Sequence, residues 1–222
     1  MDLEVKGIRK RYGKKVPLED VTFSADRGSC IGILGQNGSG KSTLLSILAG
    51  IQRCDAGCAL WQGQNLLTDS RLRARTVGYI PQGTPLFEEL SAYDNLLLWY
   101  TKDELKRELD GGVLDMLGIG AFLRTPVHKM SGGMKKRLSI GCAVAKKPPV
   151  LLLDEPGAAL DIPCREQIAA YLTACRQQGA LLILTTHDAG ELALCDAWYI
   201  LRGGVLHPYT YDGDMRRLAG ML

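Results

Sequence analysis

One stretch of the sequence decides the fold, and it reads Gly35-Gln36-Asn37-Gly38-Ser39-Gly40-Lys41-Ser42. It fits the pattern G-x-x-x-x-G-K-[ST] at every required position. Glycine allows such a loop to wrap closely around phosphate groups, because no Cβ blocks the inward-pointing backbone N–H groups. A chance match in a glycine-rich turn is the alternative. The apolar segments Cys30–Leu34 and Leu44–Leu48 flank the loop as the mechanism requires, so we predict a nucleotide-phosphate site.

The side chains at the end of this loop have distinct expected roles. Lys41 can reach the β- and γ-phosphates, and the Ser42 hydroxyl can ligate Mg²⁺. The helix that begins near Lys41 adds the positive end of its dipole, which favours negative charge. We therefore expect a nucleotide to be held by Gly35, Asn37, Gly38, Ser39, Gly40, Lys41, Ser42 and Thr43.

A second element complements the loop. The apolar run Val150–Leu153 is followed by Asp154 and Glu155. A buried strand that ends in a carboxylate can place Asp154 beside Mg²⁺, usually through water, because this ion keeps much of its hydration. Glu155 can accept a hydrogen bond from the attacking water, and placing water, metal and charge is most of the catalysis of phosphoryl transfer. Capping of the next helix is the alternative role for this acidic pair.

The remaining segments place these motifs in an α/β fold, because strands and helices alternate around the phosphate loop. Continuous apolar runs are typical of central parallel strands, and a Gly203-Gly204 pair favours a hairpin. The expected elements are an N-terminal strand pair at Leu3–Ile8 and Leu18–Phe23, a helical segment over 91–145, buried strands at 150–153 and 180–184, and a hairpin at Trp198–Leu206.

Composition narrows the class of protein. With 27 basic and 24 acidic residues the net charge is +3, which is too mild to indicate a nucleic-acid partner. The densest basic run, from Lys6 to Lys15, is expected to be a solvated face. Seven cysteines without a CxxC pair are expected to be small buried hydrophobes in a reducing compartment rather than zinc ligands. No signal peptide or spanning stretch is visible, so a membrane role would require another chain.

The segment that points to a family is Met130-Ser131-Gly132-Gly133-Met134, followed by three basic residues. A phosphate loop alone does not decide function, since kinases, GTPases, helicases and motors share it. This segment resembles the LSGGQ signature of ABC (ATP-binding cassette) ATPases, and it lies shortly before the acidic pair, as it does in that family. The resemblance spans nearly the whole chain.

The resemblance implies the fold in more detail. It predicts a P-loop NTPase core with a mainly parallel sheet, an N-terminal antiparallel β subdomain and an inserted helical subdomain. We expect a single ABC ATPase domain over 1–222, in which 1–88 and 147–222 form the nucleotide-binding core with the β subdomain. Residues 89–146 are expected to form the helical subdomain with the signature.

Further positions match the family in order and spacing. Tyr12 resembles the aromatic residue that stacks on adenine, and Gln82 resembles the glutamine that contacts the metal and the attacking water and moves with the membrane domain. His187 resembles the histidine at the γ-phosphate, and Ala159-Leu160-Asp161 resembles the loop that crosses to the partner subunit. Each of these residues taken alone also has an ordinary explanation. Tyr12 could be a surface or core aromatic residue, Gln82 a loop residue, and His187 a structural residue whose hydrogen bonds are satisfied within the fold. Together the matches imply catalytic roles for Glu155, His187, Gln82 and Lys41, and metal ligation by Ser42, Gln82 and Asp154.

The resemblance also implies a head-to-tail dimer. In the family, the turn that corresponds to Ser131, Gly132 and Gly133 closes over the nucleotide held by the other subunit's lysine, so neither half-site is complete alone. A Ser-Gly-Gly turn at a helix start offers a hydroxyl and exposed N–H groups to an anion. Two departures are noted. Met130 and Met134 replace the usual leucine and glutamine, and Gly157-Ala158 stands where threonine or serine is common. Methionine followed by basic residues also resembles the signature of ABC-2-type exporters.

The sequence thus predicts an ATPase that binds ATP and Mg²⁺ and powers transport through a separate transmembrane permease. The expected partners are that permease and a second ABC ATPase subunit, identical or a close paralogue, with no nucleic acid. The expected location is the cytoplasmic face of the cell membrane. Two alternatives are a soluble ABC ATPase acting on ribosomes or nucleic acid, and a cassette that binds nucleotide without hydrolysis. The cargo is not encoded in this chain, and the signature favours export only weakly.

Overall fold

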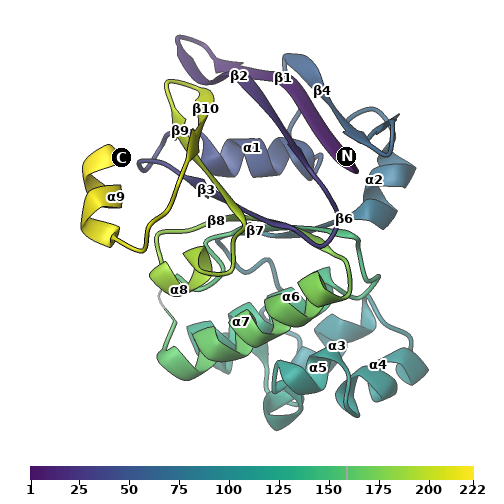
Figure 1. Ribbon diagram of the computed structural model, residues 1–222. Coiled ribbons are helices and arrows are strands. Elements are labelled where there is room, and N and C mark those ends of the chain that lie inside the picture. The colour runs from purple at the N-terminus through teal and green to yellow at the C-terminus, as the bar shows by residue number, and fades with distance from the viewer. Residues whose placement is uncertain (159) are drawn as a thin grey trace.

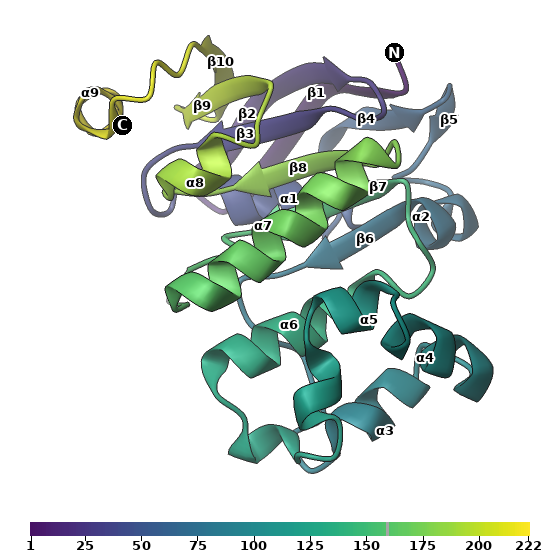
Figure 2. The ribbon, with the colours of Figure 1, turned by 60° about the horizontal axis from the view of Figure 1, so that its bottom comes forward.

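A computed structural model describes residues 1–158 and 160–222. The described strands form one mixed sheet in the order β5-β4-β1-β2-β10-β9-β3-β8-β7-β6 (Figures 1 and 2). Their bounds are β1 Leu3–Tyr12, β2 Lys15–Ala25, β3 Cys30–Leu34, β4 Ala56–Trp61, β5 Gln64–Asn65, β6 Val77–Ile80, β7 Val150–Asp154, β8 Leu181–Thr185, β9 Ala197–Arg202 and β10 Val205–Tyr209.

The five strands β9, β3, β8, β7 and β6 run parallel. The central strands β3, β8 and β7 are buried at every residue, and their apolar sequences follow from burial on both faces. Side chains alternate between the two faces along each strand. On β7, Val150 and Leu152 join one core cluster, whereas Leu151 and Leu153 join the other. A continuous apolar run is therefore needed at this place in the sheet, because neither face of it meets water.

The N-terminal strands form the antiparallel part. β1 pairs with β2 and with β4 in antiparallel register, and β4 pairs with β5. A single parallel bridge, Val205 to Asp20, joins β10 to β2. Hydrogen bonds from the backbone N–H groups of Glu19 and Asp20 to the Gly204 carbonyl, at 2.8 and 3.2 Å, reinforce this joint. The terminal hairpin is thereby fixed against the N-terminal strand pair.

Helices lie on both sides of the parallel strands (Figure 1). Helix α1 packs between these strands and the antiparallel part, and the helices from α3 to α7 lie on the opposite face. The helix bounds are α1 Lys41–Leu48, α2 Ser70–Thr76, α3 Ala92–Leu97, α4 Lys102–Leu109, α5 Val113–Met116, α6 Gly132–Ala143, α7 Ile162–Gln177, α8 Ala189–Leu192 and α9 Met215–Met221, with 3₁₀ turns at Ile119–Phe122 and Val127–Lys129.

The structure confirms the predicted α/β fold, with its antiparallel N-terminal strands, mostly parallel sheet and inserted helices. The predicted strand at 150–153 extends by one residue to include Asp154, and the hairpin joins β9 to β10 as expected. Four cysteines (Cys30, Cys142, Cys164 and Cys195) are buried, and the other three are partly buried. Among the described residues, no helix is both long and apolar enough to cross a bilayer.

Candidate ATP site and catalytic edge

The phosphate loop follows the carboxyl end of β3 and leads directly into α1. Its glycines adopt backbone angles that other residues avoid: Gly38 has φ 80° and Gly40, the N-cap of α1, has φ 111°. A Cβ atom on Gly40 would lie 2.7 Å from the carbonyl oxygen of Pro17. Glycine is therefore required at position 40 both for the turn and for the close approach of β2.

Lys41 is the buried charge of this loop, with 6 % of its surface exposed. Its Nζ atom donates hydrogen bonds to the carbonyl oxygens of Gly35 at 2.5 Å and Gln36 at 3.2 Å. Burial lowers the pKa of Lys41, and the negative charges of Glu155 and Asp154 oppose that shift. The ammonium group is thus held in place inside the loop, so little conformational entropy is lost when it meets a phosphate.

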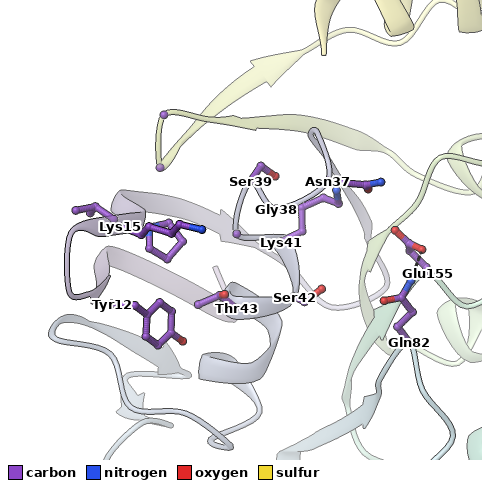
Figure 3. Close-up of a pocket in the computed structure, with 15 residues that line it drawn as sticks. Tyr12, Lys15, Asn37, Gly38, Ser39, Lys41, Ser42, Thr43, Gln82 and Glu155 are labelled. Atoms are coloured by element: carbon purple, nitrogen blue, oxygen red, sulfur yellow. Dashed lines mark hydrogen bonds between the residues drawn. The ribbon is translucent and has the colours of Figure 1, made fainter.

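An open pocket of about 810 Å³ lies over the loop (Figure 3). Tyr12 and Lys15 lie toward one end of it, and Gln82 and Glu155 lie together at the other (Figure 3). Its length suits a ligand with an aromatic base at the Tyr12 end and a phosphate chain along the loop. The lining residues are Tyr12, Lys15, Val16, Pro17, Asn37, Gly38, Ser39, Gly40, Lys41, Ser42, Thr43, Gln82, Glu155, Gly203 and Gly204.

Two hydroxyl groups of the loop, those of Ser39 and Ser42, are suited to contact a phosphate group and its bound metal ion. The Oγ atom of Ser39 is buried and has no hydrogen-bond partner within the described part of the chain, which is costly unless a ligand oxygen satisfies it. Ser42 is exposed and lines the pocket. Asp154 is 3 % exposed, and the Thr185 hydroxyl donates to its Oδ1 atom at 2.6 Å. A hydroxyl and a fixed carboxylate are hard oxygen ligands of the type that Mg²⁺ takes.

Glu155 stands where β7 ends. Its φ of 47° is unusual for a residue with a side chain, and such a conformation costs about 1–3 kcal/mol. Hydrogen bonds from its backbone N–H to the Thr185 carbonyl (3.0 Å) and hydroxyl (3.2 Å) hold the turn. The Gln82 amide donates to Glu155 Oε2 at 2.9 Å. The carboxylate is thereby aimed across the edge of the sheet toward the pocket.

His187 lies in a neighbouring hollow that it shares with Glu155. Its Nε2 atom is 3.9 Å from Glu155 Oε1. Burial, and then the positive charge of Lys41, lower the pKa of His187, while Glu155 opposes them. The neutral imidazole is favoured near pH 7, since the ordinary pKa of histidine is about 6.5. One ring nitrogen is then a donor and the other an acceptor.

Gly157, one of the departures from the family pattern, lies against a buried acidic side chain. A Cβ atom at this position would collide with the Oε1 atom of Glu191, a side chain that is 8 % exposed. Burial raises the pKa of Glu191, and hydrogen bonding to Thr186 opposes that rise. Gly157 thus lies directly beside the carboxylate of Glu191 on α8.

The predicted signature turn forms the N-terminus of α6. Ser131 is the N-cap, and its Oγ atom accepts from the Met134 N–H at 3.2 Å, so its own hydroxyl proton remains available. Ser131 and Gly133 line a separate surface pocket of about 560 Å³ with Asp161. Asp161 itself caps α7 by accepting from Cys164 N–H at 3.0 Å. The predicted loop 159–161 thus lies partly here, although Ala159 is outside the described residues.

The structure brings most of the predicted site residues together but not all. The large pocket is lined by Tyr12, Gln82, Glu155 and the loop residues from Asn37 to Thr43. Gly35 and Asp154 are buried beside this pocket, and His187 lies in the neighbouring hollow that also contains Glu155. Ser131 and Gly133 line a different pocket from that of Lys41, and Gly132 is exposed at the start of α6.

Sequence reasoning missed five lining residues: Lys15, Val16, Pro17, Gly203 and Gly204. Lys15 was expected on a solvated face. It is exposed, yet it also lines the pocket because it pairs with Tyr12 across the β1–β2 turn. The closeness of Lys15 to Tyr12 in sequence was the available signal. No local signal joined Gly203 and Gly204 to a loop more than 150 residues away.

Comparison with known proteins agrees with this geometry. Residues 18–158 match the family model described as "ABC transporter". The linearmycin resistance ATP-binding protein LnrL of Bacillus subtilis is 32 % identical over 98 % of this chain and 72 % of its own length. The sulfate/thiosulfate import ATP-binding protein CysA of Bordetella bronchiseptica is 32 % identical over 99 % of this chain and 69 % of its own length.

Two solved structures are similar over most of the chain. One is described as the ATP-binding subunit of an ABC transporter, with 31 % identity, a TM-score of 0.84 and coverage of 100 % of this chain and 94 % of the other. A second, the ATP-binding cassette MJ0796 in a dimeric post-hydrolysis state with ADP and Pi, has the same fold at 24 % identity, with a TM-score of 0.83 and coverage of 94 % and 98 %.

Proposed function

The chain belongs to the ABC transporter family as an ATP-binding and ATP-hydrolysing subunit that powers transport, and from that premise we propose how its site works. ATP lies in the large pocket with its base against Tyr12 and its phosphates along the loop of residues 35–43. The single observation on which the proposal depends is the common pocket of Lys41 and Glu155, with the water-positioning carboxylate opposite the phosphate loop.

In this mechanism the chain supplies position and charge. The loop N–H groups and Lys41 hold the phosphate oxygens, and their charges are already oriented, so the transition state gains most from them. Ser42, with Gln82 and Asp154 near it, would hold Mg²⁺, and the ion would supply positive charge to the phosphates. Glu155 accepts a hydrogen bond from the attacking water, and neutral His187 donates one toward the γ-phosphate.

The proposal requires two copies of the chain. Ser131 and Gly132 are exposed, and Ser131 and Gly133 line a different pocket from that of Lys41, so one chain alone does not surround a nucleotide. In a head-to-tail dimer each turn would meet the phosphates held by the other copy. The exposed helix N-terminus behind Gly132 offers N–H groups and dipole charge to that anion. Identical copies satisfy this geometry, and so does a close paralogue.

Dimer closure on ATP and opening after hydrolysis would move a separate transmembrane permease at the cytoplasmic face of the cell membrane. We infer that 89–146 is the helical subdomain that moves against the core formed by 1–88 and 147–222. The methionine and basic residues after Gly133 favour export. Because a relative whose name specifies import is equally similar, the co-purifying transmembrane chain is the observation that tests direction.

The test of the site is the substitution Glu155→Gln. It keeps the shape of the side chain and removes its capacity to accept the proton, so steady-state turnover should fall at least about 100-fold. ATP should stay bound, and a stable dimer should appear on gel filtration with MgATP. Glu89→Gln, an exposed glutamate in the loop after β6, is the matched control. Normal turnover in the Glu155 variant would contradict the assignment.

A further inference from the structure

Lys136 is a buried lysine on α6, the helix that begins at the Ser131 turn. It is 4 % exposed, although it lies only five residues from the exposed N-cap of α6. Lysine is almost never this buried unless its ammonium is paired, because the charged group must leave water. The position therefore has a specific reason in the fold.

The ammonium group is paired with the backbone of the loop that carries Gln82. Its Nζ atom donates to the carbonyl oxygen of Pro81 at 2.8 Å and to that of Gln82 at 3.4 Å. The carboxylates of Asp154, Glu155 and Glu191 are near enough to favour its positive charge, against the effect of burial. Lys136 is thus held between the start of this loop and the acidic edge of the sheet.

The far end of the same loop is also bound to the helical segment. The N–H groups of Val127 and His128 donate to the carbonyl oxygens of Leu90 and Glu88 at 2.9 and 3.1 Å. The loop between β6 and α3 is therefore attached to the helical segment at its end, and to α6 at its beginning through Lys136. At that beginning the Gln82 side chain reaches back to Glu155 at 2.9 Å.

We propose that Lys136 is a positioning residue that ties the helix behind the Ser131–Gly133 turn to the backbone of Gln82, so that the position of this helix controls the contact between Gln82 and Glu155. A shift of α6 when the turn meets the other copy's nucleotide then moves Gln82 and frees the Glu155 carboxylate to accept the water. Each chain thereby couples its signature turn to its own water-positioning group. This inference rests on the proposed function and adds a regulatory link to it.

The test compares five variants of the full chain with MgATP. Lys136→Met keeps the length of the side chain and removes its donors, and it should lower kcat about tenfold, as expected when a catalytic group is misplaced. The KM for ATP should stay within about twofold, because the phosphate contacts are unchanged. Lys136→Arg keeps charge and donors and should restore most of the activity.

The matched control is Lys135→Met. Lys135 is the adjacent residue on the same helix and contacts the same loop, through an ion pair with Glu88 at 3.0 Å whose glutamate is 63 % exposed. Exposed pairs of this kind contribute little, so this variant should keep kcat within about twofold of the unmodified chain. Amide hydrogen exchange over 81–90 should rise in Lys136→Met and not in Lys135→Met.

The double variant with Gln82→Ala separates positioning from a general structural role. If Lys136 acts through Gln82, adding Lys136→Met to Gln82→Ala should lower kcat by less than about twofold more. A full additional tenfold loss, or an unchanged kcat in the single Lys136→Met variant, would overturn the proposal. Either of these two results would leave the proposed ATP site valid, provided that Glu155→Gln still blocks turnover. Hydrolysis by the Glu155→Gln variant would instead overturn the proposed function.

The Lys136→Met variant is expected to fold. Gln82 is exposed and Pro81 is partly exposed, so water can replace the lost ammonium donor. Thermal melting checks this expectation. Should Lys136→Met fail to fold, Lys136→Leu, which likewise removes every donor, enters the same cycle with Gln82→Ala and is judged by the same two outcomes.

Discussion

Two helix N-termini of this chain are built to face negative charge, and they are prepared in opposite ways. At α1 the glycine loop and Lys41 line a pocket together with residues of β2 and of the turn between β9 and β10. Lys41 itself is almost completely buried. At α6 the cap is an exposed serine, followed by an exposed glycine, beside an open surface pocket. The first terminus can bind the phosphates by itself, whereas the second contributes only when another copy brings a nucleotide to it.

The difference shows how one fold divides a binding site between copies. A buried ammonium held by two carbonyl oxygens is already oriented, so its loss should weaken the first contact with ATP. An exposed turn gains its effect only when water is excluded by a partner. Substitutions at α1 should therefore act on binding by the single chain, and substitutions at α6 should act on turnover by the pair.

The largest effect that tests this division is expected from Lys41→Ala. The phosphates lose a charge-assisted contact, so the affinity for ATP should fall about 100-fold. Isothermal titration calorimetry on the full chain measures it, with Lys102→Ala on the exposed start of α4 as control. An unchanged dissociation constant would show that the loop backbone holds the phosphates without the lysine.

A smaller effect, of a different kind, is expected from Ser131→Arg. The bulky cation should block closure of the second copy, so steady-state turnover should fall about 30-fold, within the range of single catalytic contacts. ATP binding to the isolated chain should stay within about twofold. The Ser131→Ala variant loses only the hydroxyl and the helix cap, which costs about 1 kcal/mol of stability. If Ser131→Arg weakened ATP binding by the single chain, the division between the two termini would be wrong.

The smallest effect is expected from Tyr12→Ala at the far end of the pocket. Stacking of a base on an aromatic ring contributes about 1–3 kcal/mol, so ATP affinity should fall about tenfold. Tyr12→Phe keeps the ring and removes only the hydroxyl that hydrogen-bonds to the Gln52 side chain. Fluorescent nucleotide titration should show near-normal affinity for Tyr12→Phe. Equal losses in both variants would assign the effect to the hydroxyl rather than to stacking.

Most of the candidate site was predictable because its motifs are local. The conformation of residues 35–42 follows from glycines within the loop itself, and the apolar run before Asp154 and Glu155 is typical of a central strand. The lining by Gly203 and Gly204 was not predictable in the same way. It depends on the joint between β10 and β2, where chain segments more than 180 residues apart meet.

The sequence by itself determined the chemistry, namely a glycine loop with Lys41 for phosphates, a carboxylate pair at a strand end and a Ser-Gly-Gly helix start. Local residue types fix these features, because each depends on backbone angles and side chains within a few positions. Only the tertiary structure decided which of them share a pocket. It separates Ser131 from Lys41, fits Gly157 against Glu191 and buries Lys136 beneath Gln82. Those contacts arise from packing of distant segments, for which no short stretch of sequence holds a signal.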